Sequence, residues 1–199
     1  MDDDLLDAVK GGNLERTEEL LLSGREVDQR DSDGRTALML AVRMSRPDLT
    51  GLLLEHGADV MAESGCGQSA MEHALLCCKD KTVFQLLLDH GAKLDQDSLD
   101  ASFRDACSWF PPDLEKLRLL LWLGADPDSK RFGPPSLHLA VLQHASHGRK
   151  RDNRGVVSLL LSAGADVKAK TEDGKTALDW AREDNEGSEI IEMLLAAGA

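Results

Sequence analysis

A glycine recurs along the chain at an almost constant interval, and each time it follows a leucine-rich segment. These glycines are Gly24, Gly57, Gly91, Gly124, Gly164 and Gly198, at spacings of 33, 34, 33, 40 and 34 residues. Glycine takes the left-handed conformation that ends a helix without steric cost. The sequence therefore predicts a series of similar repeats, each closed by a leucine-rich helix that stops at its glycine.

A second pattern marks the opening of a repeat in three places. Residues 33–38 and 173–178 read Asp-Gly-Arg-Thr-Ala-Leu and Asp-Gly-Lys-Thr-Ala-Leu, and residues 133–140 are a variant with two prolines. Glycine suits a turn, threonine caps the helix that follows, and proline in the first helical turn loses no hydrogen bond. Each repeat is therefore expected to contain a turn, a first helix and a second helix.

Together these segments resemble the ankyrin repeat, in which a turn, a Thr-Pro-Leu-His-x-Ala helix and a leucine-rich helix end at Gly-Ala. The resemblance implies an all-α solenoid of stacked helix-turn-helix repeats with β-turn tips. It predicts one domain over residues 1–199, with repeats near 1–30, 31–63, 64–97, 98–129, 130–170 and 171–199. His138 stands where the family has a histidine that bonds to the backbone of a neighbouring turn.

Three repeats depart from the pattern. The repeat at 98–129 has Asp-Ala-Ser-Phe in place of a glycine turn, so its first helix is predicted to start differently. The repeat at 130–170 carries about seven extra residues between its helices, within 147–155. The repeat at 1–30 lacks the opening turn, as is expected of a terminal repeat with a solvated outer face.

Composition narrows the classes of function. The chain has 23 basic and 36 acidic residues and a net charge of −13, which argues against direct binding of nucleic acid or of an anionic membrane. No apolar run approaches the roughly 18 residues of a membrane span, and the acidic residues 2–4 do not resemble a secretory signal. Four cysteines do not make a disulfide framework. We expect a monomer in the cytoplasm, with the nucleus as an alternative.

Segments that resemble ligand sites are better explained by the repeat. Residues 65–70 match the letters of a dinucleotide-binding loop, but no buried strand precedes them. Residues 31–34 resemble the start of a calcium loop whose closing ligand would fall at Val42. A reactive thiol at Cys77 or Cys107 is less favoured than a small buried side chain. The sequence therefore predicts no catalytic residue, no cofactor and no metal.

Partners of ankyrin-repeat proteins usually dock on the concave face, which is formed by the turns and the outward side of each first helix. Mapped by position, the residues expected there are Arg35, Arg43, Met44, Leu76, Cys77, Trp109, Phe132, Leu142, Glu172, Asp173, Glu183 and Asp184. Exposed aromatic side chains in a groove often dominate an interface, which makes Trp109 and Phe132 candidate anchors. Filling a gap beside the irregular repeat at 98–129 is an equal alternative for Trp109.

Charged residues suggest two further contacts. The acidic residues near the C-terminal end could steer a basic partner, although a solvated polar cap is the more common reason for such charges. A basic cluster in the inserted segment consists of Arg149, Lys150, Arg151 and Arg154. It could contact phosphate or an acidic strip of a partner, or serve as a nuclear-import patch, with a solvated loop as the favoured alternative.

The resemblance implies a non-catalytic module that binds a partner protein through its concave face, as an adaptor or scaffold. A second hypothesis is an acidic inhibitor or immunity-type protein that occludes a basic toxin or nucleic-acid-binding enzyme. The charge of −13 favours the inhibitor slightly, although acidic surfaces also keep such stacks soluble. The dependence of binding on salt separates the two hypotheses.

Overall fold

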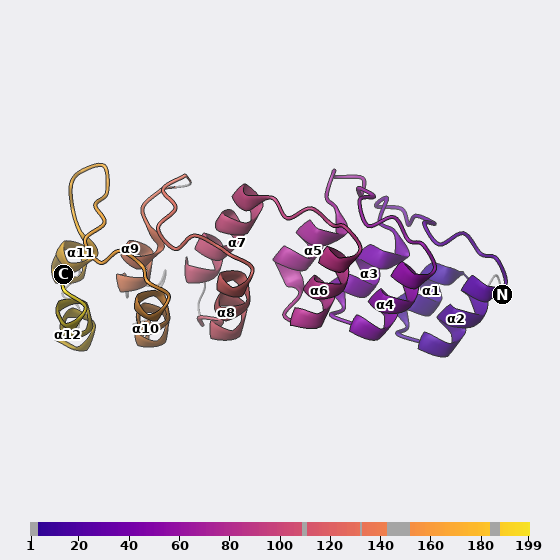
Figure 1. Cartoon of the computed structure of the whole chain (residues 1–199), viewed down its shortest axis with the longest axis horizontal. Helices are drawn as coiled ribbons and strands as arrows, with labels where there is room; N and C mark the ends of the chain where they lie inside the picture. The colour runs from indigo at the N-terminus through magenta and orange to yellow at the C-terminus, as the bar shows by residue number, and fades with distance from the viewer. Residues whose placement is uncertain (1–3, 109–110, 132, 143–151, 184–187) are drawn as a thin grey trace. The chain divides into compact units, whose positions relative to one another are not determined.

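The computed structural model describes residues 4–108, 111–131, 133–142, 152–183 and 188–199, and within them the chain forms helices joined by turns, with no strand (Figure 1). Two isolated β-bridges, Arg30 with Thr36 and Glu63 with Ser69, close turns in the described part. The chain divides into an N-terminal half, residues 1–95, and a C-terminal half, residues 96–199. The predicted all-helical fold class is confirmed.

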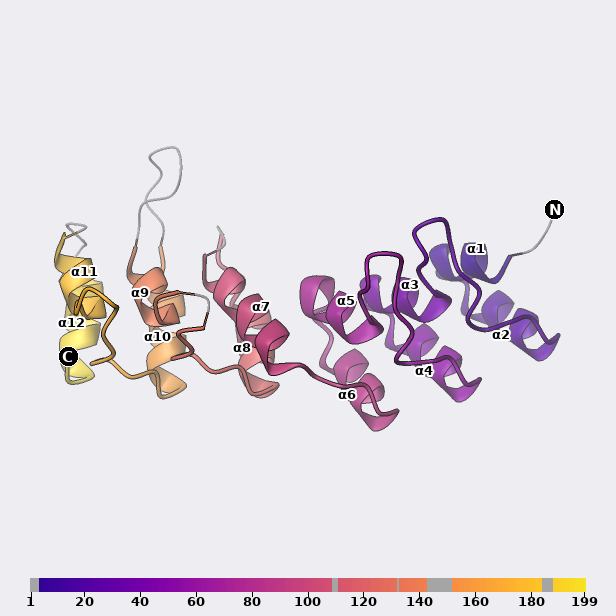
Figure 2. The ribbon, with the colours of Figure 1, turned by 90° about the horizontal axis from the view of Figure 1, so that it is seen from above.

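Helices of the N-terminal half occur in consecutive pairs. The pairs are α1 (Leu5–Lys10) with α2 (Leu14–Leu22), α3 (Ala37–Arg43) with α4 (Pro47–Glu55), and α5 (Ala70–Cys77) with α6 (Lys81–Asp89). The first helices α1, α3 and α5 lie side by side, and so do the second helices α2, α4 and α6 (Figure 2). Each pair therefore packs on its neighbours in a row.

The C-terminal half repeats this arrangement. Its pairs over the described residues are α7 (Gln96–Ser108) with α8 (Leu114–Trp122), α9 (Ser136–Val141) with α10 (Arg154–Ser162), and α11 (Ala177–Glu183) with α12 (Ser188–Ala196). First helices again pack on first helices, and second on second. None of the helices in the described ranges combines the length and hydropathy that a bilayer-spanning helix needs.

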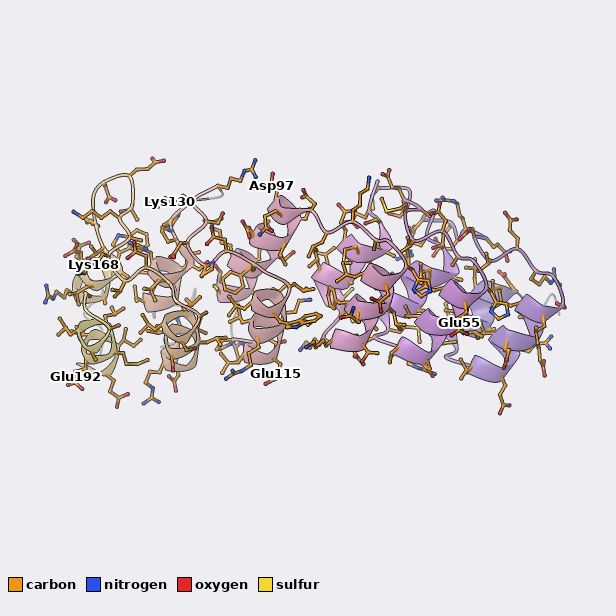
Figure 3. All side chains as sticks on the ribbon, in the orientation of Figure 1. Glu55, Asp97, Glu115, Lys130, Lys168 and Glu192 are labelled. Carbon is orange, nitrogen blue, oxygen red and sulfur yellow. The ribbon has the colours of Figure 1, made fainter. Side chains whose placement is uncertain are left out.

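The leucine triplets of the second helices form the core of each half. The middle leucine is fully buried in four of them, at Leu53, Leu87, Leu120 and Leu160. Burying one leucine side chain stabilises the fold by about 2 kcal/mol. Charged side chains occupy the outer surface of the second helices, for example Glu55 on α4, Glu115 on α8 and Glu192 on α12 (Figure 3).

The helix ends follow the sequence pattern. All six periodic glycines have positive φ angles, between 82° and 97°, so each helix stops where the pattern predicts. The Thr36 hydroxyl accepts a hydrogen bond from the Met39 amide at 3.4 Å. Ser69 and Glu72 form a reciprocal capping box, in which the Ser69 amide donates to Glu72 Oε2 at 2.7 Å. These caps satisfy amide groups that a helix start leaves unpaired.

The helix after residue 95 begins differently from the other first helices, as predicted. α7 has 13 residues, and no glycine turn precedes it. The carboxylate of Asp100, which is buried, links α7 to the segment after α8: Oδ1 accepts hydrogen bonds from Gln96 Nε2 at 2.8 Å and from the Asp126 amide at 3.0 Å. A longer helix therefore replaces the turn at this point.

Turn tips precede three of the first helices, and each is closed by the same backbone bond. The tips are residues 31–35, 64–68 and 171–175, in which the first amide donates to the fifth carbonyl at 2.9 to 3.0 Å. Segments 31–34 and 65–70 are thus turns, as the sequence favoured. The first two tips also touch each other, because the Gly65 amide donates to the Asp33 carbonyl at 2.9 Å. This contact holds consecutive tips in register.

Alanine at Gly34 should destabilise the chain more than alanine at Gly67. Both residues have positive φ angles, of 73° and 77°. A Cβ at Gly34 would lie 2.6 Å from the Gly65 amide nitrogen, whereas a Cβ at Gly67 would meet open space. We expect Gly67→Ala to cost about 1 kcal/mol from backbone strain alone and Gly34→Ala at least about 2 kcal/mol, measured by urea unfolding. Equal losses would contradict the tip contact.

Candidate protein-binding grooves

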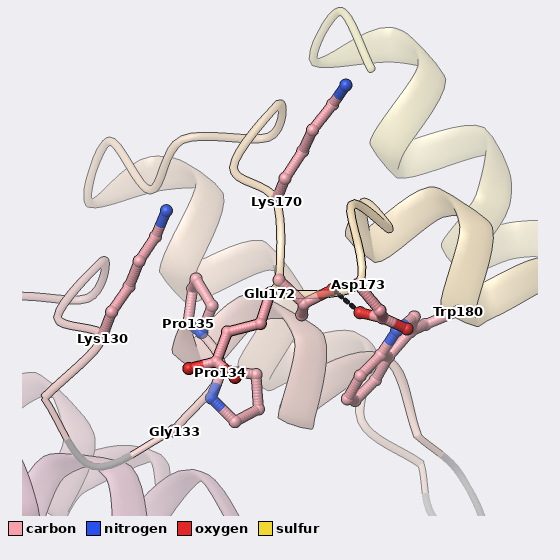
Figure 4. Close-up of a pocket in the computed structure, with 9 residues that line it drawn as sticks. Lys130, Gly133, Pro134, Pro135, Lys170, Glu172, Asp173 and Trp180 are labelled. Carbon is pink, nitrogen blue, oxygen red and sulfur yellow. Dashed lines mark hydrogen bonds between the residues drawn. The ribbon is translucent and has the colours of Figure 1, made fainter.

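Within the described residues, an open groove lies between two consecutive tip segments in each half, above a first helix. The N-terminal groove has a volume of about 810 Å³ and is lined by residues 30–35, by tip 64–68 and by His73 of α5. The C-terminal groove has a volume of about 430 Å³ and is lined by Lys130, by residues 133–135, by residues 170–173 and by Trp180 of α11 (Figure 4). Pockets of this size accommodate parts of a peptide.

His73 and Trp180 occupy the same position in their repeats. Each lies four residues after the capping residue of its helix, Ser69 in one case and Thr176 in the other. Residues four apart lie on the same side of a helix, one turn apart, so both side chains face the tips that the caps follow. The two grooves are therefore equivalent in the repeat and differ in the chemistry of the residue beneath them.

The charged lining of the N-terminal groove consists of two arginines and two aspartates, Arg30, Arg35, Asp31 and Asp33. Arg35 Nε donates to Asp31 Oδ2 at 3.1 Å, and its guanidinium also pairs with Asp33. Arg30 donates to the Gly34 carbonyl at 2.9 Å and to the carbonyl of Glu63. The predicted face residue Arg35 therefore lines a groove, but its charge is shared with two carboxylates of its own tip.

The pKa of His73 is lowered from its usual value. Burial is the main cause, because it penalises the charged imidazole, and the positive charges of Arg43 and Arg35 add to it, against a smaller opposite effect of Glu72. His73 is therefore neutral at physiological pH. No motif or spacing in the sequence distinguishes His73 as a site residue.

Other predicted residues of the N-terminal half gather at the ends of α3 and α5. Arg43 is exposed, Met44 is 40% exposed and Leu76 is 57% exposed. Cys77 is exposed as well, and its thiol donates to the His73 carbonyl at 3.0 Å. α3 packs beside α5, so these residues lie at the ends of two adjacent first helices, and none of them is part of the groove lining.

Trp180, Pro134 and Pro135 form the apolar lining of the C-terminal groove (Figure 4). The ring of His138 meets the Trp180 ring edge to face, with centroids 5.4 Å apart. His138 Nε2 in turn lies 3.1 Å from the Lys175 carbonyl in the next tip, which confirms the backbone bond expected for this histidine. Burial lowers the pKa of His138, so the neutral ring fixes the orientation of the indole.

Trp180 was not among the residues expected from the sequence. Two sequence features could have identified Trp180. It is one of few aromatic residues, and it occupies the same position in its repeat as His73 does in its own. Of the expected anchors and charged residues, Trp109, Phe132, Asp184, Arg149, Lys150 and Arg151 lie outside the described residues. Their roles stay predictions.

The remaining predicted residues of the C-terminal half are exposed to different degrees, and some already have partners within the chain. Leu142 follows α9 and is half-buried, and its carbonyl accepts a hydrogen bond from Asn153 Nδ2 at 2.9 Å. Glu172 and Asp173 are exposed at the C-terminal groove, where Asp173 accepts a hydrogen bond from the Thr171 hydroxyl. Glu183 is exposed but forms an ion pair with Lys175 at 2.7 Å.

Arg154 already has partners within the chain. Its guanidinium pairs with Asp152 at 2.7 Å and with Glu189. The hydrogen bond from Arg154 holds the pKa of Asp152 at about 2. A ligand of the basic cluster would therefore compete with two carboxylates for this residue.

The side chains of the described ranges contain no group of three or more histidine, cysteine, aspartate or glutamate residues that could hold a metal ion. Cys107 is buried, in line with the favoured interpretation, and burial raises its pKa to about 12. Cys77 is exposed, so the favoured interpretation of a buried side chain is wrong for that residue.

Comparisons with known proteins all match this chain to one family. Residues 5–98 match the family described as "Ankyrin repeats (3 copies)", and residues 136–172 match "Ankyrin repeat". "Protein glp-1" of Caenorhabditis elegans is 30% identical over 190 residues, which cover 88% of this chain and 14% of that protein. "Ankyrin repeat and SOCS box protein 6" of Homo sapiens is 32% identical over 143 residues, which cover 70% and 34%. The chain thus spans about a third or less of these relatives.

Solved structures agree with the family matches. The ankyrin repeat domain of Bcl-3, "a unique member of the IkappaB protein family", is 30% identical with a TM-score of 0.66, covering 98% of this chain and 86% of that one. An ankyrin repeat domain from Acinetobacter baumannii AYE is 28% identical with a TM-score of 0.66, covering 98% and 97%.

Alkylation of the folded chain should separate the four thiols. Cys66 and Cys77 are exposed, whereas Cys78 and Cys107 are buried. With a pKa of about 12, only about one Cys107 side chain in 10⁴ is a thiolate at pH 8, and the thiolate is the reactive form. We expect iodoacetamide to modify Cys66 and Cys77 alone, and all four cysteines after denaturation, as measured by peptide mass spectrometry. Rapid modification of Cys107 in the folded chain would contradict its burial.

Proposed function

Because the chain belongs to the ankyrin-repeat family, whose members are generally non-catalytic protein-interaction modules, we propose that it binds a partner protein through its concave face. That face consists of the tips and of the outward side of the first helices. The role that fits best is an adaptor or scaffold. The proposal includes a monomeric state, no direct contact with nucleic acid, no catalysis and a cytoplasmic or nuclear location.

The observation that carries this proposal is the presence of exposed apolar side chains at the ends of adjacent first helices whose tips are held together. Met44 and Leu76 are 40% and 57% exposed at the ends of two adjacent first helices. The tips above those helices are held together by the bond between Gly65 and Asp33. A partner would bury apolar area worth about 25 cal/mol per Å² without first having to order the tips.

The inhibitor hypothesis remains the alternative, and the net charge of −13 is the observation that favours it. Acidic residues such as Glu55 and Glu115 lie on second helices, where they can steer a basic partner from a distance (Figure 3). In the C-terminal groove the charge is mixed, since Lys130 and Lys170 face the same space as Glu172 and Asp173. The groove chemistry therefore supports the adaptor more than the inhibitor.

A glutamate placed on the concave face should weaken binding of the partner, whereas a glutamate placed on a second helix should not. Leu76→Glu puts a carboxylate beside the groove, and Leu22→Glu is its matched control, because Leu22 is 73% exposed at the end of the second helix α2. We expect Leu76→Glu to reduce capture of the partner from its native host at least about tenfold, which corresponds to about 1.4 kcal/mol. Leu22→Glu should bind normally, and both variants should unfold within about 2 °C of the parent because both leucines are exposed. Equal binding by both variants would contradict a site on the face.

Salt distinguishes the adaptor from the inhibitor. A complex held mainly by apolar contacts should keep most of its affinity between about 0.05 M and 0.5 M salt, whereas one held by the acidic surface should lose its partner steeply. We expect the first result for the complex captured above, measured as the fraction retained on the immobilised chain. A loss of more than about tenfold over this range would favour the inhibitor.

A further inference from the structure

The C-terminal groove is lined mainly by apolar and rigid side chains. Pro134 and Pro135 form one wall, and the half-buried indole of Trp180 lies across from them (Figure 4). The imidazole of His138 meets the indole edge to face, with centroids 5.4 Å apart and planes at 86°, and its Nε2 atom lies 3.1 Å from the Lys175 carbonyl. Because His138 is buried and bonded to the next tip, it fixes the plane of the indole. An occupant would therefore meet a surface that needs little ordering.

The backbone of this groove is poorly suited to pairing with an added β-strand, which needs a row of free N–H and C=O groups. On one side the two prolines have no backbone N–H, and the Gly133 amide donates to the Lys130 carbonyl at 3.3 Å. On the other side the Thr171 amide donates to the Lys175 carbonyl at 3.0 Å. Among the described residues, none accepts a hydrogen bond from the indole N–H of Trp180. This group is therefore the donor that the apolar part of the groove offers to an occupant.

The charged side chains of the lining balance one another. Lys130 and Lys170 stand against Glu172 and Asp173, so the lining has no net charge. Asp173 also accepts a hydrogen bond from the hydroxyl of Thr171. A strongly acidic or strongly basic segment would be attracted by two of these groups and repelled by the other two. The lining therefore selects an occupant by its shape and its carbonyl groups rather than by its charge.

From these features we infer that the C-terminal groove binds a proline-rich segment of the partner in the polyproline II conformation. Proline rings of the segment pack on the indole of Trp180 and against Pro134, and one of its carbonyls accepts a hydrogen bond from Trp180 Nε1. Aromatic-lined grooves recognise such segments because the polyproline II helix is preformed and its carbonyls have no partner within the segment. The inference rests on the proposed function, since it specifies what the partner presents to one groove.

Proline suits this groove better than other apolar residues do. An apolar segment without proline would pack on the same indole, but it would bring an N–H group at every residue to a backbone that offers few partners, and it would lose more conformational entropy on binding. The equivalent N-terminal groove shows the contrast. Its lining, as far as the structure describes it, contains neither proline nor tryptophan, and it has His73 where the C-terminal groove has Trp180. The inference therefore applies to the C-terminal groove.

A direct test uses the full chain and four capped heptapeptides. The first contains five prolines and two glutamines, the second has alanine in place of each proline, and the other two have glutamate or lysine in place of both glutamines. Binding is measured by fluorescence anisotropy. We expect the first peptide to bind at least about tenfold more tightly than the alanine peptide, and both charged peptides to bind within about threefold of the first. Equal binding of the alanine peptide, or a preference of more than about threefold for one sign of charge, would overturn the inference.

Variants and NMR locate the contact. Trp180→Phe keeps an aromatic ring but removes the indole donor, and should weaken binding of the first peptide about fivefold to tenfold. Trp122→Phe is its matched control, because Trp122 is 42% exposed on the second helix α8, and it should change nothing. The indole N–H signal that Trp180→Phe removes should shift when the peptide binds to the parent chain.

A second variant decides the matter even if Trp180→Phe does not fold. Pro134→Ser removes a half-buried ring from the groove wall and should also weaken the peptide, whereas Pro111→Ser changes an exposed proline before α8 and should not. If Pro134→Ser binds like the parent, or if the indole signal of Trp180 does not move, the inference is wrong. Absence of peptide binding, with capture of the partner still sensitive to Leu76→Glu, would leave the proposed function standing.

Discussion

The structure depends on burial of leucines between consecutive helix pairs within each half. Several of its helices are too short to persist alone: α1 and α9 have six residues, and α3 has seven. Isolated helices of this length are unstable in water, because the first turn costs more entropy than its hydrogen bonds return. Packing against the next pair supplies the missing stabilisation, and this is why the leucine triplets recur at the repeat interval.

This way of folding leaves little of a first helix exposed: α3 is buried from Ala37 to Val42 and exposed at Arg43. The inner side packs on neighbouring first helices and on the second helix of its own pair, so it is fixed by the core. The first-helix residue that lies below the tips can differ from one repeat to the next. His73 and Trp180 illustrate this freedom, since one position holds a donor between arginines and the other holds an aromatic ring beside prolines. Equivalent positions of the repeat therefore carry side chains of different chemistry on the same backbone arrangement.

The sequence predicted the helix pairs well, because the residues that start and end each helix lie next to its ends. A periodic glycine can only end a helix, and Thr36 or Ser69 can only cap the helix that begins next to it. The bond from His138 to the tip at Lys175 also followed from its position in the repeat.

The chemistry of the grooves was not predictable in the same way. The groove around His73 joins tips about 33 positions apart in sequence, and no local pattern shows that its Nε2 atom is buried without a hydrogen-bond partner. Trp180 reaches its groove through the packing of consecutive tips, which no local pattern in the sequence encodes. Exposure of Cys77 similarly depends on where α5 ends, which one residue can change.

Hydrogen–deuterium exchange of the full chain, alone and in complex with the partner from its native host, tests the central claim most directly. A partner seated on the face would slow exchange in tips 31–35 and 64–68 and at the ends of α3 and α5, and would leave α2, α4 and α6 unchanged. Slower exchange confined to α2, α4 and α6 would contradict the account, because binding would then use the opposite surface of the helix pairs.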